Sequence, residues 1–175
     1  NLSTGALIWD QVSNPGAGGD QAKDIAIDST GIYVVGTDSG AGWQMRIEKR
    51  NLSTGALIWG QVSNPTVAYE YATGVAVDST GVYIAGYDTS TSNNFWRAEK
   101  RNLSTGALMW SQVSTATANT KIVYGAATDN SGFYLAGEDS TKWRIEKRDL
   151  STGITLWTQF TNLLALSYNT PRDVE

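Results

Sequence analysis

The sequence lacks cysteine and histidine, and it has only three prolines among 175 residues. Without cysteine there can be no disulfide bonds, thiolate metal ligands or cysteine nucleophiles, and without histidine there can be no histidine-based triad or zinc site. Thirteen basic against seventeen acidic residues give a net charge of −4, which opposes non-specific attraction to nucleic acid. No apolar run approaches the roughly 18–20 residues that span a bilayer. We therefore expect no nucleic-acid partner and no membrane insertion.

The sequence also has no initiator methionine and no signal peptide, and its first residue already lies inside a repeated word. We expect an excerpt or processed piece of a longer chain, whose address label is lost with the rest.

One nine-residue word recurs about every 50 residues: NLSTGALIW begins at Asn1 and Asn51, NLSTGALMW at Asn102, and DLSTGITLW at Asp149. This period predicts one supersecondary unit copied in series. Residues 1–15 and 51–65 differ only at Asp10 and Gly60. Such close copies favour a scaffold or a multivalent surface over one asymmetric active site.

The copy at residues 22–64 predicts four short antiparallel strands. KDIAID has period two, Asp28–Gly31 has type I turn chemistry, and GIYVVGTD is apolar enough to be covered on both faces. WQMRIEKR and ALIWGQVSN complete the unit, and no helical periodicity persists for ten residues. We predict an all-β fold of three complete four-stranded β-propeller blades with partial strands at both ends. Their bounds are residues 22–64, 72–114 and 121–161.

All seven tryptophans occupy repeat-equivalent positions, on the third predicted strand (Trp43, Trp96, Trp143) or on the fourth (Trp9, Trp59, Trp110, Trp157). We predict that they pack blade against blade, with an aromatic ring for sugars or a cofactor as the alternative.

The phrases IAIDSTGIYVVGTDS, VAVDSTGVYIAGYDTS and AATDNSGFYLAGEDS resemble the β-propeller repeat (SBBP-type) and, more distantly, NHL-type blades. RIEKRNLSTGALIW is similar to the D-x-x-TG-x-x-x-W phrase of quinoprotein-like propellers. The resemblance implies that IAID is the innermost strand, ALIWGQV the outermost, and that Ala26, Ala76 and Ala127 line the axis. It specifies architecture rather than activity.

In that frame, residues 1–14 are a lone outer strand and residues 170–175 begin a further blade. Three blades cannot close a ring, since propellers usually have about four to eight. Two copies cannot close one either, because the second and third strands are missing at each junction. We therefore expect the single repeat domain, residues 1–175, to be part of a larger propeller that continues past Glu175. The alternative is an open, filament-like stack of blades.

Three sequons, at Asn1, Asn51 and Asn102, predict either N-glycosylation or plain turn chemistry. Asp149 in the fourth copy suits a turn and not a glycan. Aspartates beside glycine (Asp28, Asp38 and their copies) suggest calcium as a minor alternative to turns, because no D-x-D-x-D loop is present. We otherwise expect no cofactor.

One charged stripe per copy, beginning with Arg46, Glu48 and Arg50, predicts ion pairs between neighbouring strands or simple solvation. Lys49, Lys100 and Lys147 share the parity of the apolar face, which suggests buried stems with amines at the rim. Every acid except a few loop residues has a repeat twin, so we expect no catalytic or metal site. Non-repeated residues lie in connectors, where the loop candidates for ligand contact are Tyr69, Glu70, Tyr71 and Tyr168.

These observations favour a noncatalytic propeller scaffold or binding module of a larger secreted or cell-surface protein, acting in adhesion, assembly, or polysaccharide or protein binding. Its partners would include further blades of its own chain. The alternative is the propeller part of a quinoprotein-like or other extracellular enzyme whose catalytic residues lie outside this sequence.

Overall fold

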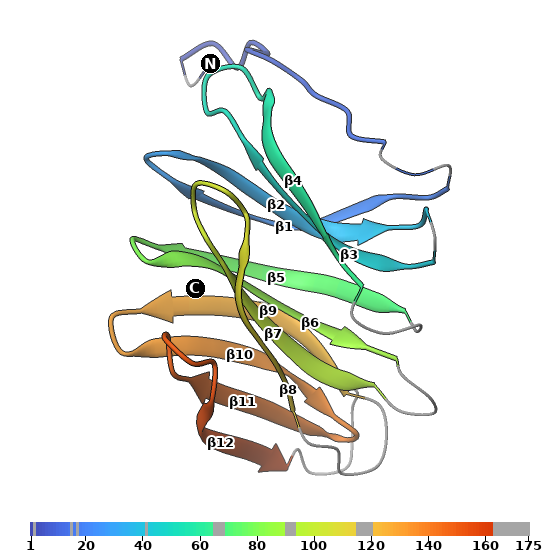
Figure 1. Cartoon of the computed structure of the whole chain (residues 1–175), viewed down its shortest axis with the longest axis vertical. Coiled ribbons are helices and arrows are strands. Elements are labelled where there is room, and N and C mark those ends of the chain that lie inside the picture. Colours follow the sequence, from blue (N-terminus) through green and yellow to red (C-terminus); the bar gives the residue numbers. More distant parts are fainter. Residues whose placement is uncertain are drawn as a thin grey trace.

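Among the residues that the structure describes, twelve strands form three separate four-stranded antiparallel sheets, as the repeats predict (Figure 1). A computed structural model describes residue 1 and residues 3–14, 16, 18–40, 42–64, 69–89, 94–114 and 121–162. These described residues contain no helix. The all-β prediction is confirmed.

Each sheet is a simple up-and-down meander, which we call a blade. Blade 1 consists of β1 (Gln21–Asp28), β2 (Gly31–Asp38), β3 (Gln44–Arg50) and β4 (Leu57–Ser63). Blade 2 consists of β5 (Glu70–Asp78), β6 (Gly81–Asp88), β7 (Phe95–Arg101) and β8 (Leu108–Val113). Blade 3 consists of β9 (Lys121–Asp129), β10 (Gly132–Asp139), β11 (Lys142–Arg148) and β12 (Thr155–Asn162).

The turn between the first two strands of each blade is held by one aspartate. Asp28 Oδ1 accepts hydrogen bonds from the backbone N–H groups of Thr30 at 2.7 Å and Gly31 at 3.0 Å, and the Tyr33 hydroxyl donates to Oδ2. Burial opposes ionisation of Asp28, but these hydrogen bonds outweigh it and lower its pKa. Asp78 and Asp129 hold the same turns in the other blades.

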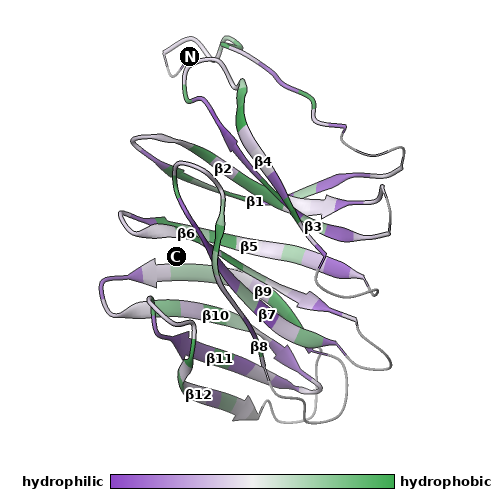
Figure 2. Ribbon diagram, in the orientation of Figure 1, coloured by the Kyte–Doolittle hydropathy of each residue, from purple (hydrophilic) through white to green (hydrophobic). Residues whose placement is uncertain are grey.

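The blades stack face to face, with β5 packed between β1 and β9. These inner strands approach closely: a Cβ on Gly74 would lie 3.0 Å from the Ala126 Cβ. The second strands, β2 and β6, are buried on both faces, and hydrophobic residues run along β2 (Figure 2). A single sheet cannot bury two faces alone, so the core of this protein lies between blades.

Candidate binding surfaces

A tight turn joins the third and fourth strands of every blade. In blade 1, Asn51 Oδ1 accepts from the N–H groups of Ser53 at 2.9 Å and Thr54 at 3.0 Å, and Gly55 closes the turn at φ +68°. Asp149 accepts the same two bonds in blade 3. Only an acceptor oxygen is needed, which explains why asparagine and aspartate exchange here. Glycosylation of Asn1, Asn51 or Asn102 stays a prediction.

In blades 2 and 3, side chains of the preceding blade hold this turn from outside, as blade 1 does with the turn of blade 2. Trp59 Nε1 donates to the Leu103 carbonyl at 3.2 Å, and Gln61 Nε2 donates to the Thr105 carbonyl at 3.3 Å. The indole lies on the turn glycine, since a Cβ on Gly106 would be 2.7 Å from Trp59 Cε3. We call this arrangement of a tryptophan, a glutamine and a lysine on the next blade's turn the clamp. It recurs at Trp110 on Gly153.

The lysine of the clamp explains the residues for which the sequence suggested no role beyond a buried stem. Lys49 Nζ donates to Thr30 Oγ1 at 2.8 Å in its own blade and to the Leu103 carbonyl at 3.1 Å in the next. It also lies 5.1 Å from the Tyr33 ring centroid. Lys100 repeats these contacts with Thr80, Leu150 and Tyr83, and burial lowers its pKa against the opposing charges of Asp78 and Asp149.

The charged stripe is buried, so solvation is the wrong explanation. In blade 2, Glu99 is fully buried, pairs with Arg101 at 2.8 Å and accepts a hydrogen bond from Ser63 of blade 1. Arg97 pairs with Asp88 at 2.8 Å, which is the expected pairing of neighbouring strands. This burial could not be predicted from the sequence, because alternating charges are also typical of an exposed face. The residues that cover the stripe belong to the preceding blade and are distant in the sequence.

The N-terminal segment contains no strand among its described residues, but it contacts blade 1 as an outer strand would. Trp9 Nε1 donates to the Leu52 carbonyl, Gln11 Nε2 to the Thr54 carbonyl, and Ser13 to Glu48. A Cβ on Gly55 would lie 2.5 Å from Trp9 Cε3. Residues 3–14 thus make on blade 1 the side-chain contacts that β4 makes on blade 2.

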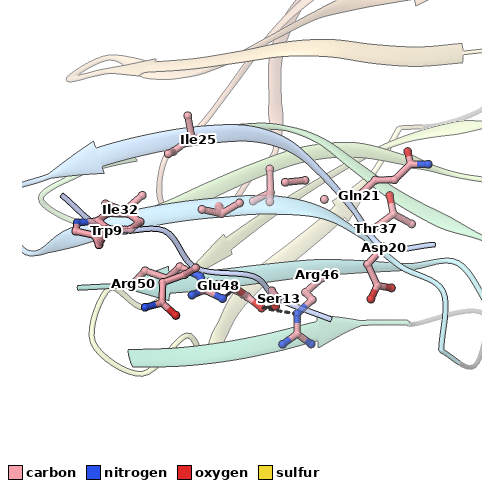
Figure 3. Close-up of a pocket in the computed structure, with 15 residues that line it drawn as sticks. Trp9, Ser13, Asp20, Gln21, Ile25, Ile32, Thr37, Arg46, Glu48 and Arg50 are labelled. Carbon is pink, nitrogen blue, oxygen red and sulfur yellow. Dashed lines mark hydrogen bonds and ion pairs between the residues drawn. The ribbon is translucent and has the colours of Figure 1, made fainter. Parts of the chain in front are cut away.

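A cavity of about 300 Å³ lies beside this segment on the face of blade 1 (Figure 3). Its lining includes Ile25, which is 57% exposed, whereas the equivalent Val75 of blade 2 is 4% exposed. Burial raises the pKa of Glu48 here, but hydrogen bonds from Ser13, Arg46 and Arg50 outweigh it and lower the pKa. The cavity is therefore an uncovered part of a blade-to-blade surface.

Blades 2 and 3 differ from blade 1 in having a side chain of the preceding blade at the centre of this face. On blade 2, Met45 of blade 1 would come within 2.4 Å of a Cβ on Gly86, and on blade 3, Trp96 would come within 2.8 Å of one on Gly137. The nearest neighbours of Gly36 on blade 1 belong only to Gln21 and Ala22 of its own blade.

The loop candidates have different environments. Tyr69 is exposed, whereas Glu70 begins β5 and is fully buried, which removes its side chain from any ligand in solvent. Tyr71 stacks on Tyr87 at 4.9 Å between ring centroids and on Trp43 at 6.3 Å. Tyr168 lies outside the described residues, and so does the predicted further blade at residues 170–175.

The aspartate turns use their carboxylates within their own loops, as at Asp28. Within the described part of the chain, no three acidic, histidine or cysteine side chains are grouped so that they could hold a metal ion. No helix suited to crossing a membrane occurs in that part either.

The blades are those of the β-propeller fold. Two solved structures of this fold are similar to the chain: BamB from Moraxella catarrhalis, with a TM-score of 0.55 and 16% identity, and the quinohemoprotein alcohol dehydrogenase ADHIIG from Pseudomonas putida HK5, with a TM-score of 0.63 and 17% identity. The matches cover 82% and 89% of this chain, but the chain spans only 36% and 22% of those proteins.

No protein-family model matches the chain, and no curated protein matches it. The likeness at these identities shows the fold alone. The SBBP-type and NHL-like resemblance therefore stays a prediction, while the β-propeller architecture is confirmed.

Proposed function

We propose that this chain is a noncatalytic propeller module that serves as a scaffold or binding surface in a larger secreted or cell-surface protein. One observation carries the proposal: the charged side chains that could do acid–base chemistry are engaged in repeated structural contacts. Glu48, Glu99 and Glu146 pair with arginines of their own strands. Acid–base catalysis needs a group placed in a unique pocket, and a thrice-repeated ion pair does not supply one.

A binding role is supported by what is not repeated. The connector before β5 presents the exposed Tyr69 beside Tyr71, and the ring of Tyr71 stacks on Tyr87 and on Trp43, one of the repeated tryptophans. Aromatic rings bring large contact area at low entropic cost, and propeller loops vary without disturbing the blades. We place the contact for a protein or polysaccharide partner at these aromatic residues.

The chain itself should be tested against arrays of glycans and against candidate proteins, with Tyr69→Ala as the variant and Ile58→Ala, an exposed residue on β4, as the matched control. Binding that Tyr69→Ala weakens about tenfold and Ile58→Ala leaves unchanged supports the proposal. An affinity that is unchanged in Tyr69→Ala would contradict this placement of the contact.

A propeller domain of a quinone-dependent enzyme is the second candidate, favoured by the structural likeness to the quinohemoprotein alcohol dehydrogenase. Its catalytic residues would lie outside this sequence. Quinone-dependent oxidation of alcohols by the longer protein, lost on removal of this domain, would replace the first proposal.

A further inference from the structure

Blade 3 carries the gripping side of a clamp that holds no turn among the described residues. Trp157 of β12 occupies the position of Trp59 and Trp110, yet it is 39% exposed, against 9% for Trp59. Lys147 donates to Ser131 at 2.9 Å and lies 5.3 Å from the Tyr134 ring centroid. These are the contacts that Lys49 makes within its own blade, without the carbonyl of a following turn.

The indole of Trp157 is nevertheless already oriented for gripping. Its ring centroid lies 6.3 Å from that of Tyr134, with 55° between the planes. The occupied pairs have almost the same geometry, at 6.2 Å and 51° for Tyr33 with Trp59, and 6.2 Å and 54° for Tyr83 with Trp110. Each blade therefore fixes the orientation of its own tryptophan, whether or not a turn is bound. A preorganised site loses less entropy on binding.

The complementary half lies at the other end of the chain. Asn1 Oδ1 accepts from the N–H groups of Ser3 and Thr4, and Gly5 N–H donates to the Asn1 carbonyl at 2.7 Å with φ +66°. This turn has the form of the three gripped turns. A Cβ on Gly5 would meet nothing within 4 Å, whereas the other three turn glycines each lie under an indole.

One molecule cannot bring its own two halves together in this arrangement. The N-terminus lies at one end of the stack and β12 at the opposite end (Figure 1). The ungripped turn and the empty clamp therefore face different neighbours.

We propose that the Asn1–Gly5 turn of a second copy docks on blade 3, with Trp157 lying on Gly5, Gln159 donating its amide to the Thr4 carbonyl, and Lys147 donating to a carbonyl of the turn. The occupant follows from continuity with the interface between successive blades, which this chain repeats with the same turn sequence. The contact joins two different surfaces, so it builds head-to-tail chains. It spans one turn, and such a small contact is weak and concentration-dependent. It concerns the chain of residues 1–175, because a further blade after β12 in a larger protein would compete for the same clamp.

The test is the association of the whole chain by sedimentation velocity over increasing concentration. Trp157→Ala and Gly5→Ala should each weaken self-association at least tenfold, the first by removing the indole and the second by adding a Cβ that meets it. Leu156→Ala and Gly19→Ala are the matched controls, since Leu156 is an exposed neighbour on β12 and Gly19 has open space and no positive φ. Both controls should associate like the parent chain.

Mixing the two deficient variants separates a lost contact from a lost fold. The Trp157→Ala chain keeps an intact turn and the Gly5→Ala chain keeps an intact clamp, so the mixture should form one-to-one dimers that grow no further. A parent chain that is monomeric at every soluble concentration overturns the proposal. So does association that persists in Trp157→Ala, or a mixture that stays monomeric while the parent associates.

Discussion

Blades 1, 2 and 3 have the same strands and turns, but within the described residues only blade 2 has a neighbouring blade on both faces. Its Glu99 and Trp96 are fully buried. In blade 1 the equivalent Glu48 borders a cavity. In blade 3, Trp157 is more than a third exposed, whereas the equivalent Trp59, which blade 2 covers, is buried. We therefore expect equivalent residues to contribute differently to stability, because their burial depends on whether a neighbouring blade covers them. Substitutions of equivalent residues in different blades test this difference.

The largest difference should come from the outer-strand tryptophans. Trp59→Ala removes an indole that is buried against the turn of blade 2, and we expect a loss of about 3–5 kcal/mol in the free energy of unfolding. Trp157→Ala removes one that lacks a gripped turn, and we expect a loss of roughly 1 kcal/mol. Urea unfolding followed by circular dichroism measures both. Equal losses would contradict the idea that the clamp is the main contact.

The next difference should come from the buried glutamates. Glu99→Gln leaves Arg101 buried without its charge partner, which typically costs about 3–5 kcal/mol. Glu48→Gln should cost roughly half as much or less, because Arg50 beside it is more exposed and the cavity admits solvent. Thermal unfolding of both variants at neutral pH tests the ranking. A greater loss from Glu48→Gln would reverse it.

The turn glycines should differ by less. Gly106→Ala places a Cβ in the left-handed region and against the Trp59 ring, so we expect a cost of about 2–3 kcal/mol. Gly5→Ala meets the same backbone strain without the ring, and should cost about 1 kcal/mol within the monomer. Comparison of the urea midpoints, measured at low protein concentration, separates strain from contact.

Low pH should produce the smallest loss of stability, and this loss should involve more than one acidic group. The pKa values of Glu48 and Asp28 lie below their ordinary values of 4.5 and 3.8, so below these values the unfolded chain binds more protons than the folded one. Their contribution to stability is complete above about pH 4.5 and is lost as the pH falls through the lower folded values. Melting temperatures from pH 7 to pH 2 should fall only in the acid range. Glu48→Gln should reduce that fall.

The repeats were enough to predict the blades, because turn chemistry and strand parity are local. The Asp28 turn and the doubly covered β2 follow from a few neighbouring residues. The burial of Glu99 could not be read in this way, because Ser63 and the rest of its cover come from another copy of the repeat. Lys49 was missed for the same reason: its decisive acceptor, the Leu103 carbonyl, is 54 positions away. Glu70 was placed in a connector because nothing local marks where β5 begins.

Each clamp recognises carbonyl oxygens and a bare glycine, features that any copy of the repeat carries whatever its other side chains. A duplicated blade would therefore find its clamp contacts on both sides, and only the side chains at the centre of each blade-to-blade surface, such as Met45 and Trp96, would have to be matched anew. Such a protein can lengthen or shorten by whole units while its individual surfaces diverge.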